Sequence, residues 1–115
     1  MNNNQVYGLK GESLAVKYLK KHGYKIIERN YKCAIGEIDI IAKHKGVLVF
    51  VEVKSRNSML FGRPAEAVDE FKQHKLEQLA AFYININKLY DVFARFDVVE
   101  ILGDEVNLIQ NAWTL

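Results

Sequence analysis

The 115-residue sequence predicts an α/β domain in which one mixed sheet is flanked by helices, with elements in the order αβββαβ and a final short strand. Two segments repeat apolar residues at helical spacing, and short runs rich in valine and isoleucine lie between and after them. The run VLVFVEV is apolar on both alternating faces for most of its length, which is typical of a central strand covered on both sides. This length suits one domain, so we expect a single unit over residues 1–115.

The first helix is expected over residues 8–22, where apolar residues such as Val16 and Leu19 share one stripe. Gly23 follows as a C-terminal stop, because glycine readily adopts the left-handed conformation that ends many helices. The segment YKIIERNYKC, residues 24–33, then predicts the first strand.

Two further strands, IDIIA and VLVFVEV, are expected to pair as a hairpin through the turn KHKG at residues 43–46. A loop over residues 56–63 leads to a second helix, which we expect to begin at Pro64 and to continue to about residue 86. The remaining strands are RFDVVEI at 95–101 and EVNLIQ at 105–110, joined by a turn at Gly103-Asp104.

The composition predicts a protein with its own hydrophobic core, without an internal disulfide and outside the membrane. Half of the residues are hydrophobic, which is enough for a core without disulfides, and the only cysteine excludes an internal disulfide. We expect a cytoplasmic protein that does not enter a membrane, because the N-terminus lacks signal-peptide features and the apolar runs are too short to span a bilayer.

Charge is distributed unevenly along the chain. Residues 1–63 hold twelve Lys and Arg against five Asp and Glu, whereas residues 64–115 hold four against nine. A basic surface that meets an anion such as nucleic acid would explain this asymmetry. Charges scattered over solvated faces would explain it equally well.

The strands carry charged residues at places that otherwise read as buried. Glu52 and Lys54 share one face at the end of the VLVFVEV strand, and the hairpin brings Asp39 across from Glu52. Glu12 lies on the apolar stripe of the first helix and therefore needs a partner. A buried ion pair between Lys54 and Glu52 is the structural interpretation of these charges.

Taken together, the charges favour a metal site. Converging carboxylates repel each other unless a cation joins them, and Mg²⁺ prefers oxygen ligands. Such an ion activates water and polarises a phosphate, and a neighbouring lysine such as Lys54 orients water or offsets charge in the transition state. This set of groups is the one that phosphodiester hydrolysis requires.

Asp39, followed thirteen residues later by Glu52-Val53-Lys54, resembles the PD-(D/E)xK signature of restriction-endonuclease-like nucleases, which include Holliday-junction resolvases. Over nearly the whole chain, GEIDIIA, VFVEVKSR, FGRPAEAV and RFDVVEI are similar to motifs of the YraN family of small bacterial proteins. The residue before Asp39 is Ile38 instead of the proline in the signature.

The resemblance implies a restriction-endonuclease-like fold and a Mg²⁺- or Mn²⁺-dependent endonuclease that acts on DNA, including branched DNA. Asp39, Glu52 and the backbone carbonyl of Val53 would hold the metal, and Lys54 would activate water. Glu12 would complete the acidic cluster, directly or through water. By analogy with resolvases, a homodimer is the expected assembly. The alternatives are a nucleic-acid-binding module that keeps the fold without cutting and a protein adaptor with structural charges.

Five basic residues are expected to contact the nucleic-acid backbone: Lys43, Lys45, Arg56, Arg63 and Lys72. The alternative for Arg56 and Arg63 is that they are ordinary surface charges, and the alternative for Lys72 is an aliphatic stem packed at the edge of the second helix. The three histidines show no metal-ligand spacing and are expected on the surface.

Overall fold

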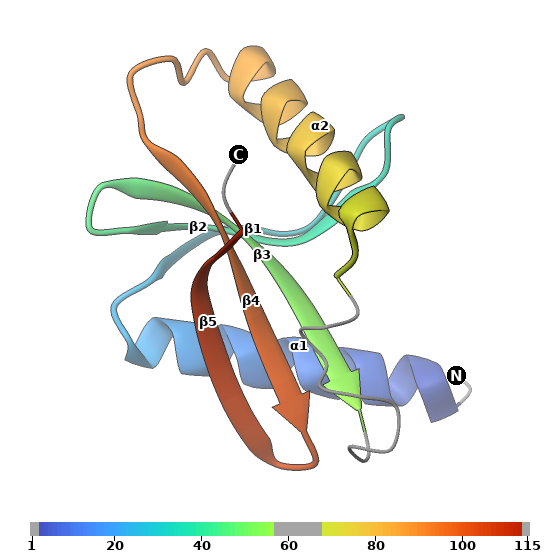
Figure 1. The fold of residues 1–115 in the computed structure, drawn as a ribbon. Helices are drawn as coiled ribbons and strands as arrows, with labels where there is room; N and C mark the ends of the chain where they lie inside the picture. The colour runs from blue at the N-terminus through green and yellow to red at the C-terminus, as the bar shows by residue number, and fades with distance from the viewer. Residues whose placement is uncertain (1–2, 57–67, 114–115) are drawn as a thin grey trace.

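The structure, a computed structural model, describes the backbone of residues 3–56 and 68–113 and the side chains of residues 11–55 and 68–113. Its elements, in chain order, are α1 (Asn3–Lys21), β1 (Lys25–Lys32), β2 (Glu37–His44), β3 (Val47–Arg56), α2 (Glu70–Ile86), β4 (Ala94–Leu102) and β5 (Glu105–Trp113). The predicted α/β fold with its αβββαβ order and final strand is therefore confirmed (Figure 1).

The five strands form one mixed sheet in the order β1-β2-β3-β4-β5. Only β3 and β4 run parallel, while the other neighbours are antiparallel. This follows from the connections, because a parallel pair needs a long crossover, which here contains α2. The β2–β3 hairpin turns tightly at Lys45 and Gly46, which both have positive φ.

Two cores lie on opposite faces of the sheet. On one face, α1 residues such as Leu19 pack against Val49 and Val51 of β3. On the other, α2 residues such as Leu79 pack against Phe50. Because alternate residues of β3 are buried on both faces, the prediction of a central, doubly covered strand is confirmed.

The start of α2 differs from the prediction. The helix begins at Glu70, because Asp69 adopts an extended conformation and its carboxylate accepts the N–H of Lys72 at 2.9 Å. An aspartate in this position caps a helix, which explains why the helix is not continuous from residue 64. Pro64 itself lies outside the described residues.

The last two strands are longer than predicted. The strand β5 continues to Trp113 because it pairs with β4 along its length, as far as Phe96. The predicted end at residue 110 missed this extension, because residues 110–112 form a bulge that breaks the two-residue alternation of a strand. Neither helix in the described part of the chain is long and apolar enough to cross a membrane.

Candidate active site

Glu52 is the centre of a charged cluster on the α2 side of the sheet. Its side chain follows Phe50 on the same face of β3, and the residue is only 5% exposed. Its Oε1 lies 3.6 Å from the Lys54 Nζ and 3.7 Å from the Lys72 Nζ. One buried carboxylate oxygen therefore faces two ammonium groups, one from the same strand and one from the first turn of α2.

Asp39 joins this cluster from the neighbouring strand β2. Its Oδ2 accepts the backbone N–H of Val53 at 2.9 Å, which fixes the carboxylate against β3 beside Glu52. Burial, followed by the negative charge of Glu52, raises the pKa of Asp39 to about 7, while the hydrogen bond from Val53 acts in the opposite direction. Ionised carboxylates at both positions repel each other, and this repulsion is what a bound cation would relieve.

Glu12 does not join the two carboxylates. Its Oε1 accepts hydrogen bonds from the Arg29 Nε at 3.2 Å and the Asn30 Nδ2 at 3.0 Å. The helix α1 packs on the sheet face opposite to Glu52, so Glu12 finds its partners on β1. Within residues 11–55 and 68–113, no group of three or more His, Cys, Asp and Glu side chains is placed to hold a metal ion. Glu12 is therefore paired with β1 residues, and its role in the acidic cluster, directly or through water, stays a prediction.

The predicted basic residues are dispersed. Lys72 lies in the cluster, as described above. Lys43 and Lys45 lie at the hairpin end of β2, and Lys43 is four residues, or about 13 Å, from Asp39 along the strand. The side chain of Arg56 and the whole of Arg63 lie outside the described residues.

Glu100 is a further acidic residue beside the cluster that the sequence analysis missed. It lies opposite Lys54 in the parallel β3–β4 register, is 2% exposed, and accepts a hydrogen bond from the Asn107 Nδ2 at 3.2 Å. Its position in RFDVVEI, among residues that alternate into the core, was the available signal.

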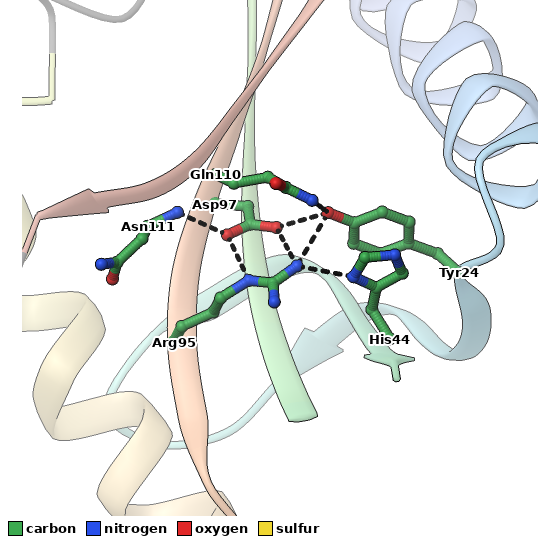
Figure 2. Close-up of polar contacts among 6 residues, drawn as sticks. All are labelled: Tyr24, His44, Arg95, Asp97, Gln110 and Asn111. Atoms are coloured by element: carbon green, nitrogen blue, oxygen red, sulfur yellow. Dashed lines mark hydrogen bonds and ion pairs between the residues drawn. The ribbon is translucent and has the colours of Figure 1, made fainter. Parts of the chain in front are cut away.

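A second polar cluster lies on the α1 side of the sheet and is built around Asp97, which is fully buried (Figure 2). The Arg95 guanidinium donates from Nε to Oδ1 at 3.0 Å and from its terminal nitrogen to Oδ2 at 3.2 Å. The Tyr24 hydroxyl donates to Oδ2 at 2.8 Å, and the Asn111 N–H donates to Oδ1 at 2.9 Å. The Asp97 carboxylate is therefore fully paired.

A bulge in β5 makes one of these bonds. Phe96 pairs with Trp113 and Val98 with Ile109, so three residues of β5 lie opposite Asp97 alone. One of the three is Asn111, which has positive φ and whose N–H turns to the Asp97 carboxylate.

His44 belongs to this second cluster and is 8% exposed, so its expected place on the surface is wrong; His22 and His74 are exposed as expected. Its ring stacks on Tyr24 with centroids 4.1 Å apart, and its Nδ1 lies 2.9 Å from an Arg95 terminal nitrogen (Figure 2). Since a guanidinium can only donate, Nδ1 is the acceptor and the imidazole is neutral. Burial, then the positive charges of Arg95 and Lys45, lowers the pKa of His44.

The two clusters have different chemistry. In the Asp97 cluster a carboxylate pairs with a guanidinium, and the Tyr24 hydroxyl and the Asn111 N–H donate the other hydrogen bonds to it. Such complete pairing is typical of structural networks. The Asp39–Glu52 cluster places two carboxylates side by side with ammonium groups around one of them. Only the Asp39–Glu52 cluster resembles a site that takes a cation and an anionic substrate.

Comparison with known proteins identifies the family. Residues 11–101 match the model of an uncharacterised protein family, UPF0102. A UPF0102 protein of Caldanaerobacter subterraneus subsp. tengcongensis is 50% identical over 96% of this chain and 97% of its own length. A UPF0102 protein of Caldicellulosiruptor saccharolyticus is 44% identical over 96% of this chain and 99% of its own length. These matches confirm the YraN-like resemblance, and the chain belongs to the UPF0102 family.

Proposed function

We propose that this protein is a Mg²⁺- or Mn²⁺-dependent endonuclease that acts on DNA. The observation that carries the proposal is the convergence of the Asp39 and Glu52 carboxylates from adjacent strands, with Lys54 and Lys72 on Glu52. Branched DNA as the substrate and a homodimer as the working assembly follow from the resemblance to resolvases and belong to the same proposal.

The donor set fits a hard divalent cation. Both carboxylates supply oxygen ligands. Burial and the charge of Glu52 oppose the ionisation of Asp39, and a bound cation would offset both effects. Asp39, Glu52 and the backbone carbonyl of Val53 would hold the ion. When bound, it would polarise a phosphate oxygen and make a coordinated water a better nucleophile.

The lysines supply positive charge for the substrate. In the described structure both ammonium groups compensate Glu52. If the carboxylates instead engage a cation, Lys54 and Lys72 are free to face a phosphate. Lys54, which is the less exposed of the two, would offset the negative charge that develops during hydrolysis. The more exposed Lys72 would bind the phosphate before the reaction.

The direct test is a cleavage assay on linear, flapped and four-way DNA, with Mg²⁺, with Mn²⁺ and with a chelator. Asp39→Asn, Glu52→Gln and Lys54→Ala should each reduce cleavage by about 10²-fold or more, because each removes a ligand or a catalytic charge. Lys54→Ala should keep its DNA affinity, since its role lies in the chemical step.

Exposed residues of the same types supply the controls. Glu105→Gln at the start of β5 and Lys88→Ala after α2 should leave cleavage unchanged. Absence of cleavage by the wild-type protein on every DNA and metal would refute the endonuclease.

A non-cutting nucleic-acid-binding module is the second candidate. The observation that favours it is the compensation of Glu52 by two lysines in a site where, among described residues, only two carboxylates meet. This candidate predicts DNA binding that persists in Asp39→Asn and Glu52→Gln, with no cleavage by any variant.

A further inference from the structure

A surface pocket of about 290 Å³ lies at the start of α2, beside the candidate active site. Its lining residues are Glu37, Phe71, Lys72, Lys75, Leu76 and Leu79. Lys72 belongs to both places, because its ammonium group lies 3.7 Å from the Glu52 carboxylate. A ligand in the pocket would therefore be next to the carboxylate pair.

The pocket combines an apolar floor with an exposed aromatic ring. Leu76 and Leu79 are buried core residues, whereas Phe71 is 80% exposed. A phenylalanine in water next to an apolar floor offers a flat surface to a planar ligand. Nucleobases stack on such side chains in single-strand-binding proteins, whatever the base.

Positive charge flanks the ring. Phe71 and Lys75 are one helical turn apart and so occupy the same side of α2. The Lys75 stem crosses the β1–β2 connection, with its Cε 3.4 Å from the place where a Cβ of Gly36 would lie. Lys72 is held by Glu52, whereas no ion pair among the described residues engages Lys75, so the Lys75 ammonium group is available to an anion at this pocket.

We propose that this pocket binds an unpaired nucleotide of the DNA substrate, with its base stacked on Phe71 and a neighbouring phosphate on Lys75. The volume is close to the lower limit for ligand sites and is enough for one planar base, and the face of the Phe71 ring can stack only on a base that is not already stacked in a duplex. The inference deepens the proposed function and rests on it: the substrate class becomes DNA with unpaired bases next to the cleaved phosphodiester, as in flaps, tails and open junctions.

The test measures binding in a chelator, where no cleavage occurs, so that it is independent of catalysis. The probes are a fluorescent single-stranded 12-mer and an abasic oligonucleotide with the same number of phosphates. The variants are Phe71→Ala, Phe71→Trp and Lys75→Ala, with Phe93→Ala as the matched control, because Phe93 is 84% exposed and lies outside the pocket lining.

Phe71→Ala should weaken binding of the 12-mer about five- to hundredfold and leave binding of the abasic probe unchanged. Phe71→Trp should restore binding, and Phe93→Ala should have no effect. Lys75→Ala should weaken binding of both probes and lower the salt dependence by about one phosphate contact.

Equal effects of Phe71→Ala and Phe93→Ala, or an equal loss on both probes, would overturn the proposal. So would a wild-type protein that does not bind the 12-mer but cleaves duplex DNA with Mg²⁺, and that result would leave the endonuclease intact. Phe71-dependent binding of the 12-mer without cleavage in Mg²⁺ or Mn²⁺ would instead refute the endonuclease and support the pocket.

Discussion

Asp39 lies in β2 between two fully buried isoleucines, Ile38 and Ile40, and its carboxylate is held by the N–H of Val53. A pKa near 7 means that this group carries a proton in the metal-free folded state over much of the pH range where free aspartate is ionised. A cation that binds there must displace that proton. The charge of one residue therefore links folding, pH and metal binding.

The free energy of unfolding of the metal-free protein should fall as the pH rises from about 4 through 7, and Asp39→Asn should remove this part of the pH dependence. The folded pKa lies above the unfolded value of 3.8, so the folded state holds a proton that the unfolded state releases. The contribution of Asp39 to the free energy of unfolding is therefore fully present below about pH 4 and is lost as the pH rises through about 7. One pKa unit corresponds to about 1.4 kcal/mol, which sets an upper limit on the order of 4 kcal/mol.

Urea unfolding of both proteins at pH 5 and pH 8 in a chelator measures the effect. His44 contributes with the opposite sign, because its lowered pKa costs stability as the pH falls below about 6.5. That contribution is common to both proteins and cancels in their difference. Equal pH dependence in the two proteins would show that Asp39 is not perturbed, and a large loss of stability at pH 8 in the variant would favour a structural ion-pair network.

At the scale of elements, helix and strand ends position the charged groups. The first turn of α2 carries Lys72 to Glu52 because Asp69 caps the helix at that point. On the other face of the sheet, where Asp97 pairs with Val51 of β3, the Asp97 cluster joins Tyr24, the residue before β1, to β2, β4 and β5 through hydrogen bonds. The site and this structural cluster are therefore separate parts of one sheet.

Asp69→Ala should destabilise the protein by about 1 kcal/mol, because the Lys72 N–H at the helix start loses its acceptor. Asp69→Ser keeps an acceptor and should cost much less. Thermal or urea unfolding at one pH compares the three proteins. A loss in Asp69→Ser as large as that in Asp69→Ala would show that the cap is not the cause.

Asp97→Asn should destabilise the protein by about 3–5 kcal/mol, because it leaves the Arg95 guanidinium without its carboxylate partner. The double variant Asp97→Leu with Arg95→Met should be less destabilised than Asp97→Asn, since no unpaired charge is left. The exposed control Asp91→Asn should change the free energy of unfolding by less than about 0.5 kcal/mol. A small effect of Asp97→Asn in urea unfolding would contradict a structural role for the cluster.

At the scale of the whole molecule, the sheet keeps the order of the chain. Strands β1 to β3 come from the basic first half of the chain and β4 and β5 from the acidic second half, while the helices cross this division: α1, from the basic half, packs against β1, β3, β4 and β5. The candidate site lies on β2 and β3, in the part of the sheet that comes from the basic half. If the proposed DNA substrate approaches this part of the sheet, lysine side chains meet its phosphates.

DNA affinity should therefore fall steeply with salt. If about three phosphates are contacted, the logarithm of the association constant should fall with the logarithm of salt with a slope of about −2.7. Fluorescence anisotropy between 50 and 200 mM salt measures this slope, and Lys43→Ala and Lys45→Ala should each reduce it by about one if they are among the contacts. Affinity that does not change with salt would favour the adaptor interpretation.

Much of the fold could be predicted from the sequence because its signals are local. Apolar spacing marked both helices and all five strands, and the two apolar faces of VLVFVEV marked β3 as central. The part of the site that depends on the β2–β3 hairpin could also be predicted. The pairing of Ile40 with Val51 brings Asp39 and Glu52 side by side, and the face on which each strand residue lies follows from its position in the sequence.

The remaining features depend on contacts between residues far apart in the chain. The partner of Glu12 is Arg29 because α1 lies on the sheet face away from Glu52, and the burial of His44 depends on Tyr24, Arg95 and Asp97. The sequence by itself determined the elements, their order and the Asp39–Glu52 pair. Only the tertiary structure decided which helix covers which face, and with it the partner of each buried charge, because a charge is paired by what surrounds it in space and not by its neighbours in sequence.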